Sequence, residues 1–369
     1  MRVLALNPGS SSLKTALVQD GKPVGWAAWS LPEAGDDTTV VGEALDRWST
    51  VDAVAIRFVH GGSRAGPERL DGLAIGALQR LIPLAPLHQP RAVGLARAVF
   101  RLRPSIPVVA AFDTSFHATL PPAATHYPLP REWTRQGRLR RYGFHGLSCR
   151  HAARRVGELL DVAEPRLLCC HLGAGVSVTA IRDGWSMDTS MGFTPLEGPA
   201  MATRSGSVDP GLLLHVMRTA PMGAEEMEDA LYRRSGLAGM SGTDGDLRSV
   251  LASATTGDPD ALAAMEVYLH RVRREIGAMA VALDRLDAVV FTGGVAAHQP
   301  ELLARLTEPL GVLGIEADSE RCLGDGDRVV SPEGASVTAL VLGTGEEKEL
   351  ARAAEEVLAA RTRPKAPTG

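Results

Sequence analysis

Two stretches far apart in the chain follow one plan, which consists of an apolar strand, a glycine turn, a second strand and a closing Asp-Gly pair. Residues 2–21 read RVLAL, NPGSSS and LKTALVQDG, and residues 166–184 read RLLCC, HLGAG and VSVTAIRDG. A chain that repeats one supersecondary unit is expected to contain two similar halves. The repeat therefore predicts a two-domain α/β chain whose halves face a cleft.

Both turns have the composition of an oxyanion-binding loop. Gly9 lets the main chain approach a ligand closely, and the hydroxyl and amide groups of Ser10, Ser11 and Ser12 suit phosphate oxygens. For the octet NPGSSSLK alone, a polar hairpin turn without a ligand is an equally good interpretation. Two such turns across one cleft favour a nucleotide phosphotransferase.

Composition and charge exclude several other classes. With 45% hydrophobic and 22% charged residues, the chain is expected to be soluble, and its net charge of −4 gives no general attraction to nucleic acid or membranes. No apolar run approaches the about 18 residues of a membrane span, and a signal-peptide pattern is missing, so we expect a cytoplasmic protein. Buried free thiols are expected at Cys149, Cys169, Cys170 and Cys322.

In the first half, polar residues follow two expected strands. Strands are predicted at residues 51–59 and 106–112 and a helix at 72–82, whereas 22–49 and 119–138 are predicted to be turn-rich or Pro-rich loops. The strands deliver Arg57 and Asp113 to their ends, which is typical of α/β sites. An isolated arginine at a strand end is more often part of a surface salt bridge.

The second half is expected to begin with a helix over residues 149–160, capped by Ser148, so the domain boundary is placed between 147 and 148. Residues 185–210 have the composition of a long functional loop. Further helices are predicted at residues 211–217, 224–234, 259–286 and from Glu346 onward, strands at 288–292 and 337–342, and a frayed tail after Arg361.

A series of motifs runs through nearly the whole chain. In order they are NPGSSSLK, RFVHGG, PLHQP, FDTSFH, RRYGFHG, HLGAG, DTSMGFTPLEG, TRSG-x-VDP, SG-x-x-G-x-SG and FTGG. This series resembles the acetate kinases, within the acetate and sugar kinase, Hsp70 and actin superfamily. The resemblance implies a duplicated ribonuclease-H-like (actin-like ATPase) clamshell that forms a homodimer. It also implies reversible phosphoryl transfer from ATP to acetate or propionate, giving acyl phosphate and ADP.

The resemblance assigns site residues motif by motif. The implied catalytic residues are Arg57, His88, Asp113, His145 and Arg204. The implied ligands of Mg²⁺ or Mn²⁺, largely through water, are Asn7 and Glu346. The implied pocket for the substrate's methyl group consists of Arg57, Val59, Leu87, Phe144 and Pro195. The implied nucleotide-binding residues are Ser12, Lys14, His171, Leu172, Gly173, Ala174, Gly175, Asp246, Leu247, Arg248, Gly294, Val295, Ala296, Ala297 and His298.

The departures from the family pattern fall mainly on the nucleotide side. Ala174 stands where the family usually has Asn, and GVAAH at residues 294–298 replaces the usual GIGEN. The first domain is also trimmed between residues 20 and 49. Two alternatives therefore stay open, namely an enzyme with another phosphoryl donor such as pyrophosphate, and a catalytically weak protein that binds an acyl phosphate or nucleotide.

The implied reaction suits the implied residues. Phosphoryl transfer requires positioning and charge neutralisation, which the planar forks of Arg57 and Arg204 can supply. The attacking carboxylate is already ionised at neutral pH, so Asp113 is expected to position an arginine or a metal-bound water rather than act as a base. Residues 1–147, joined by the helix at 346–361, are expected to form the carboxylate-side domain, and residues 148–345 the nucleotide-binding domain.

Overall fold

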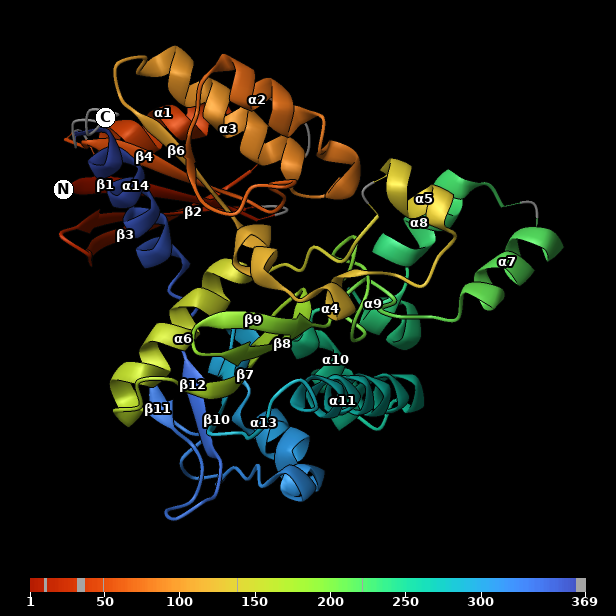
Figure 1. Cartoon of the computed structure of the whole chain (residues 1–369). Helices are drawn as coiled ribbons and strands as arrows, with labels where there is room; N and C mark the ends of the chain where they lie inside the picture. Colours follow the sequence, from red (N-terminus) through yellow and green to blue (C-terminus); the bar gives the residue numbers. More distant parts are fainter. Residues whose placement is uncertain (10–11, 32–36, 49, 138, 221, 363–369) are drawn as a thin grey trace. The chain divides into compact units, whose positions relative to one another are not determined.

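The computed structural model of the protein describes all residues except 10–11, 32–36, 49, 138, 221 and 363–369. The chain divides into two compact units, each built around a six-stranded sheet (Figure 1). The first unit consists of Met1–Thr119, Phe144–His151 and Gly345–Gly369, and the second of Leu120–Gly143 and Ala152–Thr344. The expected boundary at 147/148 differs from this division, because residues 120–143 group with the second unit.

The two sheets repeat one topology. The first has the order β3-β2-β1-β4-β6-β5, with β1 (Arg2–Pro8), β2 (Ser12–Gln19), β3 (Lys22–Ser30), β4 (Ala53–Phe58), β5 (Glu68–Arg69) and β6 (Val108–Phe112). The second has the order β11-β12-β10-β7-β8-β9, with β7 (Arg166–Leu172), β8 (Val176–Arg182), β9 (Trp185–Thr189), β10 (Ala288–Thr292), β11 (Arg328–Val329) and β12 (Thr338–Leu342). The first strand of each sheet pairs antiparallel with the second and parallel with the fourth. The predicted duplicated α/β fold is confirmed.

The closing Asp-Gly pairs form the hairpin turns that the repeat predicts. Asp20 and Gly21 have φ angles of 49° and 75°, and Asp183 and Gly184 have 54° and 80°. Positive φ at both central residues is the requirement of the type I′ turn, whose twist matches that of the flanking strands. The same turn thus fixes the register of β2 with β3 and of β8 with β9.

Helices cover both faces of the first sheet (Figure 1). They are α1 (Thr38–Arg47), α2 (Gly72–Gln79), α3 (Gln89–Leu102) and α14 (Glu346–Thr362). Because side chains alternate along a strand, Val3 and Ala5 pack in the core with α14, whereas Leu4 and Leu6 pack in the core that contains residues of α1, α2 and α3. The C-terminal helix is therefore part of the first unit.

Two predicted loops of the first half contain regular elements. Residues 22–49 contain β3 and α1. The loop prediction was wrong here because these elements bury little: β3 is an edge strand whose alternate residues face solvent, and α1 buries only Val41, Ala44 and Leu45. Residues 119–138 contain α4 (Pro122–Thr125) and α5 (Arg131–Gly137). Proline misled the loop prediction, because it is also well suited to the first turn of a helix.

The helix that leads into the second half begins earlier than expected. It is α6 (Gly146–Leu160), so Ser148 lies inside its first turn and is not the cap. The Ser148 hydroxyl instead donates to the carbonyl of His145 at 3.0 Å. The domain boundary predicted there falls within this helix.

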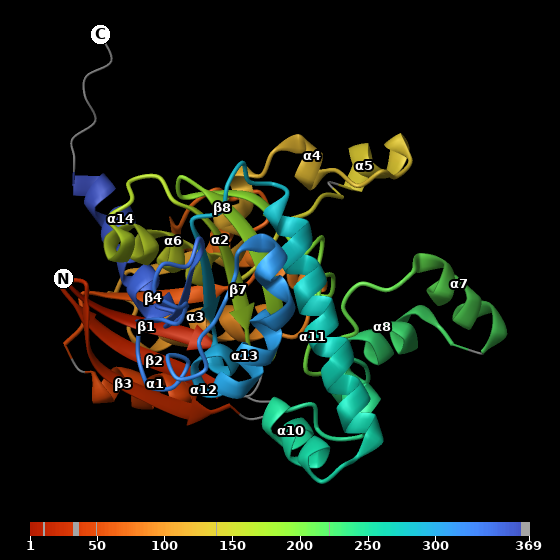
Figure 2. The same ribbon diagram turned by 90° about the horizontal axis from the view of Figure 1, so that it is seen from below.

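The second unit holds the remaining helices. They are α7 (Pro210–Thr219), α8 (Ala224–Arg233), α9 (Gly236–Ser241), α10 (Leu247–Thr255), α11 (Pro259–Ala280), α12 (Gly294–His298) and α13 (Pro300–Thr307). Figure 2 shows the long helix α11 beside β7 and β8. Of the loop predicted at residues 185–210, residues 190–209 are irregular, whereas Trp185–Thr189 form β9. All four cysteines are buried free thiols, as expected, and the tail beyond residue 362 lies outside the described residues.

Candidate active site

The centre of the candidate site is an ion pair between the ends of two neighbouring strands. Arg57 lies near the end of β4 and Asp113 directly follows β6, and these strands are parallel neighbours. Arg57 Nε donates to Asp113 Oδ1 at 3.0 Å, and Nη2 donates to Oδ2 at 2.7 Å. The side chains are 14% and 1% exposed. The fork is therefore held in one plane with little access for water.

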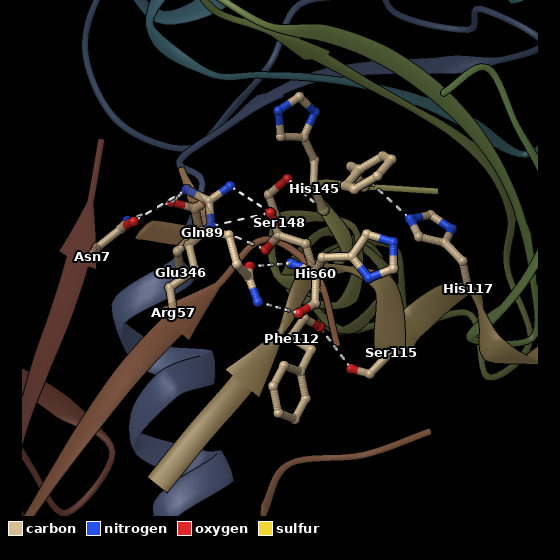
Figure 3. Close-up of polar contacts among 12 residues, drawn as sticks. Asn7, Arg57, His60, Gln89, Phe112, Ser115, His117, His145, Ser148 and Glu346 are labelled. Carbon is tan, nitrogen blue, oxygen red and sulfur yellow. Dashed lines mark hydrogen bonds and ion pairs between the residues drawn. The ribbon is translucent and has the colours of Figure 1, made fainter. Parts of the chain in front are cut away.

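The remaining nitrogen of the guanidinium connects Arg57 to the two residues implied to hold a metal. Arg57 Nη1 donates to Asn7 Oδ1 at 3.1 Å and to Glu346 Oε2 at 3.3 Å (Figure 3). Asn7 Nδ2 donates to the same Glu346 oxygen at 2.6 Å. Four predicted site residues thus form one polar network in the first unit.

Burial and the neighbouring opposite charge shift the pKa values of Arg57 and Asp113 in opposite directions. Burial lowers the pKa of Arg57, but the carboxylates of Asp113 and Glu346 outweigh it and raise that pKa above its ordinary value. Burial raises the pKa of Asp113, against the opposing effects of Arg57 and of the His145 N–H. Arg57 is therefore a permanent cation, and Asp113 acts on the site through it.

His145 supports the network with its main chain. Its backbone N–H bonds to Asp113, and its φ angle is +55°, a conformation that few residues other than glycine adopt. The next residue must be small, because a Cβ on Gly146 would lie 1.9 Å from the carbonyl oxygen of Asp113. The GFHG sequence therefore fixes the main chain beside the Asp113 carboxylate.

The other residues implied in the first unit lie at the ends of its helices and strands or just beyond them. His88 is the residue that precedes α3, Val59 follows β4, and Phe144 lies just before α6. Phe144 is 1% exposed and Val59 is 7% exposed, whereas Leu87 is half-buried.

His60 is buried in this region, and its titration gives a stability prediction. Burial lowers the pKa of His60 to about 4 from 6.5. Between about pH 6.5 and 4, the unfolded chain therefore binds a proton at His60 that the folded protein does not bind. We expect the stability contributed by neutral His60, on the order of 3 kcal/mol, to be complete above pH 6.5 and to be lost as the pH falls towards 4.

Urea unfolding from pH 7.5 to 4.5 checks this expectation. The His60→Gln variant should show a correspondingly smaller fall in the free energy of unfolding, whereas His215→Gln, at an exposed position on α7, should follow the unmodified protein. Equal slopes for all three proteins would contradict the assignment.

The second unit contains a buried arginine in a different electrostatic setting. Arg204 is 8% exposed, and burial lowers its pKa. Its Nη1 donates to the carbonyl of Pro195 at 2.8 Å and to the sulfur of Met201 at 3.6 Å. Within the described part of the chain, no carboxylate pairs with it. A buried guanidinium without a counter-charge is suited to an anionic ligand.

The loop that carries Pro195 is anchored by side chains that the sequence did not single out. Glu197 accepts hydrogen bonds from Tyr127 Oη and from Arg141 Nη2, the latter at 2.8 Å. Arg141 Nη1 also donates to the carbonyls of Thr189 and Ser190 at 3.0 and 3.2 Å. Through these bonds Glu197 supports the loop.

A cavity of about 330 Å³ lies in the second unit. Eight residues implied to bind nucleotide line it, namely Gly173, Ala174, Asp246, Leu247, Arg248, Gly294, Val295 and His298. Five further lining residues were not predicted, namely Ala202, Leu237, Gly245, Tyr268 and Gln299. Asp246 caps α10, and its bonds to the Arg248 side chain lower the pKa of Asp246 to about 2.

Some residues implied to bind nucleotide do not line this cavity. Ala296 is buried within α12, and Ala297 is half-buried there. His171 and Leu172 end β7, and Gly175 precedes β8. Lys14 and Ser12 belong to β2 of the first unit, where the Gly9 N–H donates to the Ser12 carbonyl at 2.7 Å. Ser10 and Ser11 lie outside the described residues.

The donor chemistry of Asn7 and Glu346 fits Mg²⁺. Amide and carboxylate oxygens are ligands that this ion prefers, and it usually retains several waters and binds substrate phosphates. In the described part of the chain, three or more His, Cys, Asp or Glu side chains are nowhere grouped as a metal site. The two oxygen-bearing side chains therefore suit a mostly hydrated ion rather than an all-protein cage.

Comparison with known sequences gives a consistent family. The family model described as "Acetokinase family" matches residues 38–352. The acetate kinase of Synechococcus sp. is 44% identical over 321 residues, which cover 86% of this chain and 79% of that protein. The acetate kinase of Leifsonia xyli is 41% identical over 364 residues, which cover 97% and 90%.

Solved structures with the same fold belong to similar proteins. The acetate kinase of Porphyromonas gingivalis has a TM-score of 0.86 at 32% identity, covering 97% of this chain and 99% of that one. A propionate kinase from Francisella tularensis has a TM-score of 0.88 at 29% identity, covering 95% and 98%. Among the described residues, no helix is long and apolar enough to cross a membrane.

Proposed function

Because the chain belongs to the acetokinase family, we propose that it transfers the γ-phosphoryl group of ATP reversibly to the carboxylate of acetate or propionate. The products are acyl phosphate and ADP. Within the site, the buried guanidinium of Arg204 carries the proposal, since no described carboxylate pairs with it and a phosphoryl group would supply the missing negative charge.

The transfer needs no activated nucleophile. A carboxylate oxygen of the substrate attacks the γ-phosphorus, the bond from that phosphorus to the bridging oxygen breaks, and the electron pair leaves with ADP. Arg57 orients the carboxylate and, like Arg204, neutralises charge on the phosphoryl oxygens. Asp113 keeps the Arg57 fork in its plane and is a positioning residue. His88 and His145 are proposed to donate hydrogen bonds to the transferring group.

Asn7 and Glu346 would hold Mg²⁺, or Mn²⁺, through their side-chain oxygens and water. Such an ion, when bound, neutralises charge on the nucleotide phosphates. Lys14 and Ser12 are proposed to contact the same phosphates. The substrate's methyl group is proposed to lie against Val59, Leu87, Phe144 and Pro195.

The cavity in the second unit is proposed to hold the nucleotide. Its wall of Asp246, Leu247 and Arg248 and the glycine turn at Gly173 offer polar groups beside apolar surface. No observation favours pyrophosphate as the donor or a purely regulatory role. The first unit is proposed to serve the carboxylate and the second the nucleotide. The homodimer and the cytoplasmic location stay predictions.

One assay tests the proposed function. The purified protein is incubated with Mg²⁺, acetate or propionate, and either ATP or pyrophosphate, and acyl phosphate is trapped with hydroxylamine. We expect trapped product with ATP and both acids. Product with pyrophosphate but not with ATP would show that pyrophosphate is the donor. A lack of product under every condition would overturn the proposal.

The Ala174 departure gives a prediction for nucleotide affinity. Ala174 lines the cavity, so Ala174→Asn returns a side-chain donor and is expected to lower the KM for ATP by up to about tenfold with little change in the KM for acetate. Ala296 and Ala297 do not line the cavity. The Ala296→Gly, Ala297→Glu double variant is therefore the matched control, and its KM for ATP should change little. Steady-state kinetics with varied ATP decide between them, and an unchanged KM for ATP in Ala174→Asn would contradict the placement.

A further inference from the structure

Gln89 is a buried polar residue at the start of α3 to which the proposed mechanism gives no role. Its side-chain Oε1 accepts from the backbone N–H of His60 at 3.1 Å, and its Nε2 donates to the carbonyls of His60 and Leu78 at 2.9 and 3.3 Å (Figure 3). The residue is 0% exposed. One amide thus satisfies both backbone polar groups of a single residue in another segment.

The two segments joined in this way carry walls of the proposed acyl pocket. Val59 directly precedes His60, and Leu87 and His88 directly precede Gln89. Because the Gln89 amide holds the main chain of His60 at both N–H and carbonyl, Val59 cannot move away from Leu87 unless buried hydrogen bonds break. Breaking them would leave backbone groups without partners in a site from which water is excluded.

The ring of His60 extends this support to a third wall. Its Nδ1 accepts from the Gly62 N–H at 2.9 Å, and the ring meets the Phe144 ring edge-on at a centroid distance of 5.8 Å. On the other side, His117 Nε2 lies 2.8 Å from the Phe144 carbonyl (Figure 3). Val59, Leu87 and Phe144 are therefore all tied to one buried cluster around His60.

We propose that Gln89 is a positioning residue that sets acyl chain-length selectivity by fixing the spacing of Val59, Leu87 and Phe144. This inference rests on the proposed function. A hydrophobic pocket discriminates one methylene only modestly, so its selectivity depends on walls that cannot yield. Loss of the Gln89 hydrogen bonds lets the wall at Val59 move outward, and longer acids then fit at less cost.

The test compares Gln89→Met with the unmodified protein. Methionine has nearly the shape of glutamine but makes none of the three hydrogen bonds. We expect the acetate-over-butyrate ratio of kcat/KM to fall at least about fivefold. Most of the change should come from the KM values of the acids, with kcat for acetate and the KM for ATP changed less than about twofold. Gln89→Asn keeps a neutral amide on a shorter side chain that cannot reach all three partners, and it should give an intermediate ratio if the methionine variant does not fold.

The matched control is Gln79→Met. Gln79 is exposed, and its side chain accepts a hydrogen bond from Arg97 Nη2, so its replacement should leave the ratio unchanged. A lower melting temperature with an unchanged ratio in both Gln89 variants would overturn the inference. A complete lack of acyl phosphate in the unmodified protein would instead contradict the proposed function. NMR titration with acetate, propionate and butyrate would then still report whether Gln89→Met changes their relative affinities.

Discussion

Alanine in place of Arg57 is expected to reduce turnover by at least about 10²-fold and to destabilise the protein by about 3–5 kcal/mol. The kinetic effect follows from the loss of one oriented donor to the transferring group. The effect on stability arises because the Asp113 and Glu346 carboxylates, 1% and 7% exposed, would lose the cation between them. Arg57→Lys should rescue poorly, because an ammonium group cannot make the two parallel bonds to Asp113.

Kinetics and urea unfolding measured on the same preparations check both parts. Arg103→Ala is the control, since Arg103 forms an exposed ion pair with Asp46 that is worth little. Near-normal turnover in folded Arg57→Ala would remove Arg57 from the mechanism. A stability equal to that of the control variant would show that the two carboxylates do not depend on Arg57.

The Arg204→Ala variant should lose turnover by at least about 10²-fold without losing stability. Removal of Arg204 deletes a buried charge that no described carboxylate balances, so the ligand-free protein should be as stable as before or slightly more stable. The stability of the two alanine variants should therefore differ, because only Arg57 balances the charge of buried carboxylates in the ligand-free protein.

Thermal unfolding with added inorganic phosphate distinguishes this view from a purely structural role. Phosphate should raise the melting temperature of the unmodified protein, and the increase should be smaller in Arg204→Ala. If Arg204→Ala is destabilised as strongly as Arg57→Ala, Arg204 holds the fold together and the inference of an anion site there fails.

The strands and turns that the sequence predicted are those with a short-range cause. The Asp-Gly hairpins, the strand ends at Arg57 and Asp113 and the helix from Glu346 each depend on a pattern within a few residues. The edge strand β3 and helix α1 were not predicted, because they bury few side chains. Helix α3 also escaped, although its heptad-like apolar residues are buried against the sheet.

The supports of the site had no local signature. Arg141 and Gln89 act mainly on backbone atoms far away in the sequence, as in the 49 positions between Arg141 and Ser190. Every residue has a backbone carbonyl, so the amino-acid sequence does not reveal which residue accepts such a hydrogen bond. Tyr268, Leu237 and Ala202 likewise join the wall of the cavity in the second unit only after the helices pack. The motif match supplied the residues that are proposed to contact ligands, whereas only the fold reveals the side chains that hold those residues in place.

The return of α14 to the first sheet has a consequence for the order in which the protein can fold during synthesis. Asn7 and Glu346 are hydrogen-bonded across 339 positions, and Leu350, Ala351 and Ala354 complete the core over β1. The ribosome must therefore translate the whole second unit before the first can close. Until then a hydrophobic sheet face stays exposed, which is the kind of surface that chaperones bind. The second unit, whose residues are contiguous apart from one short segment, can fold first, so the network around Arg57 is among the last parts of the molecule to form.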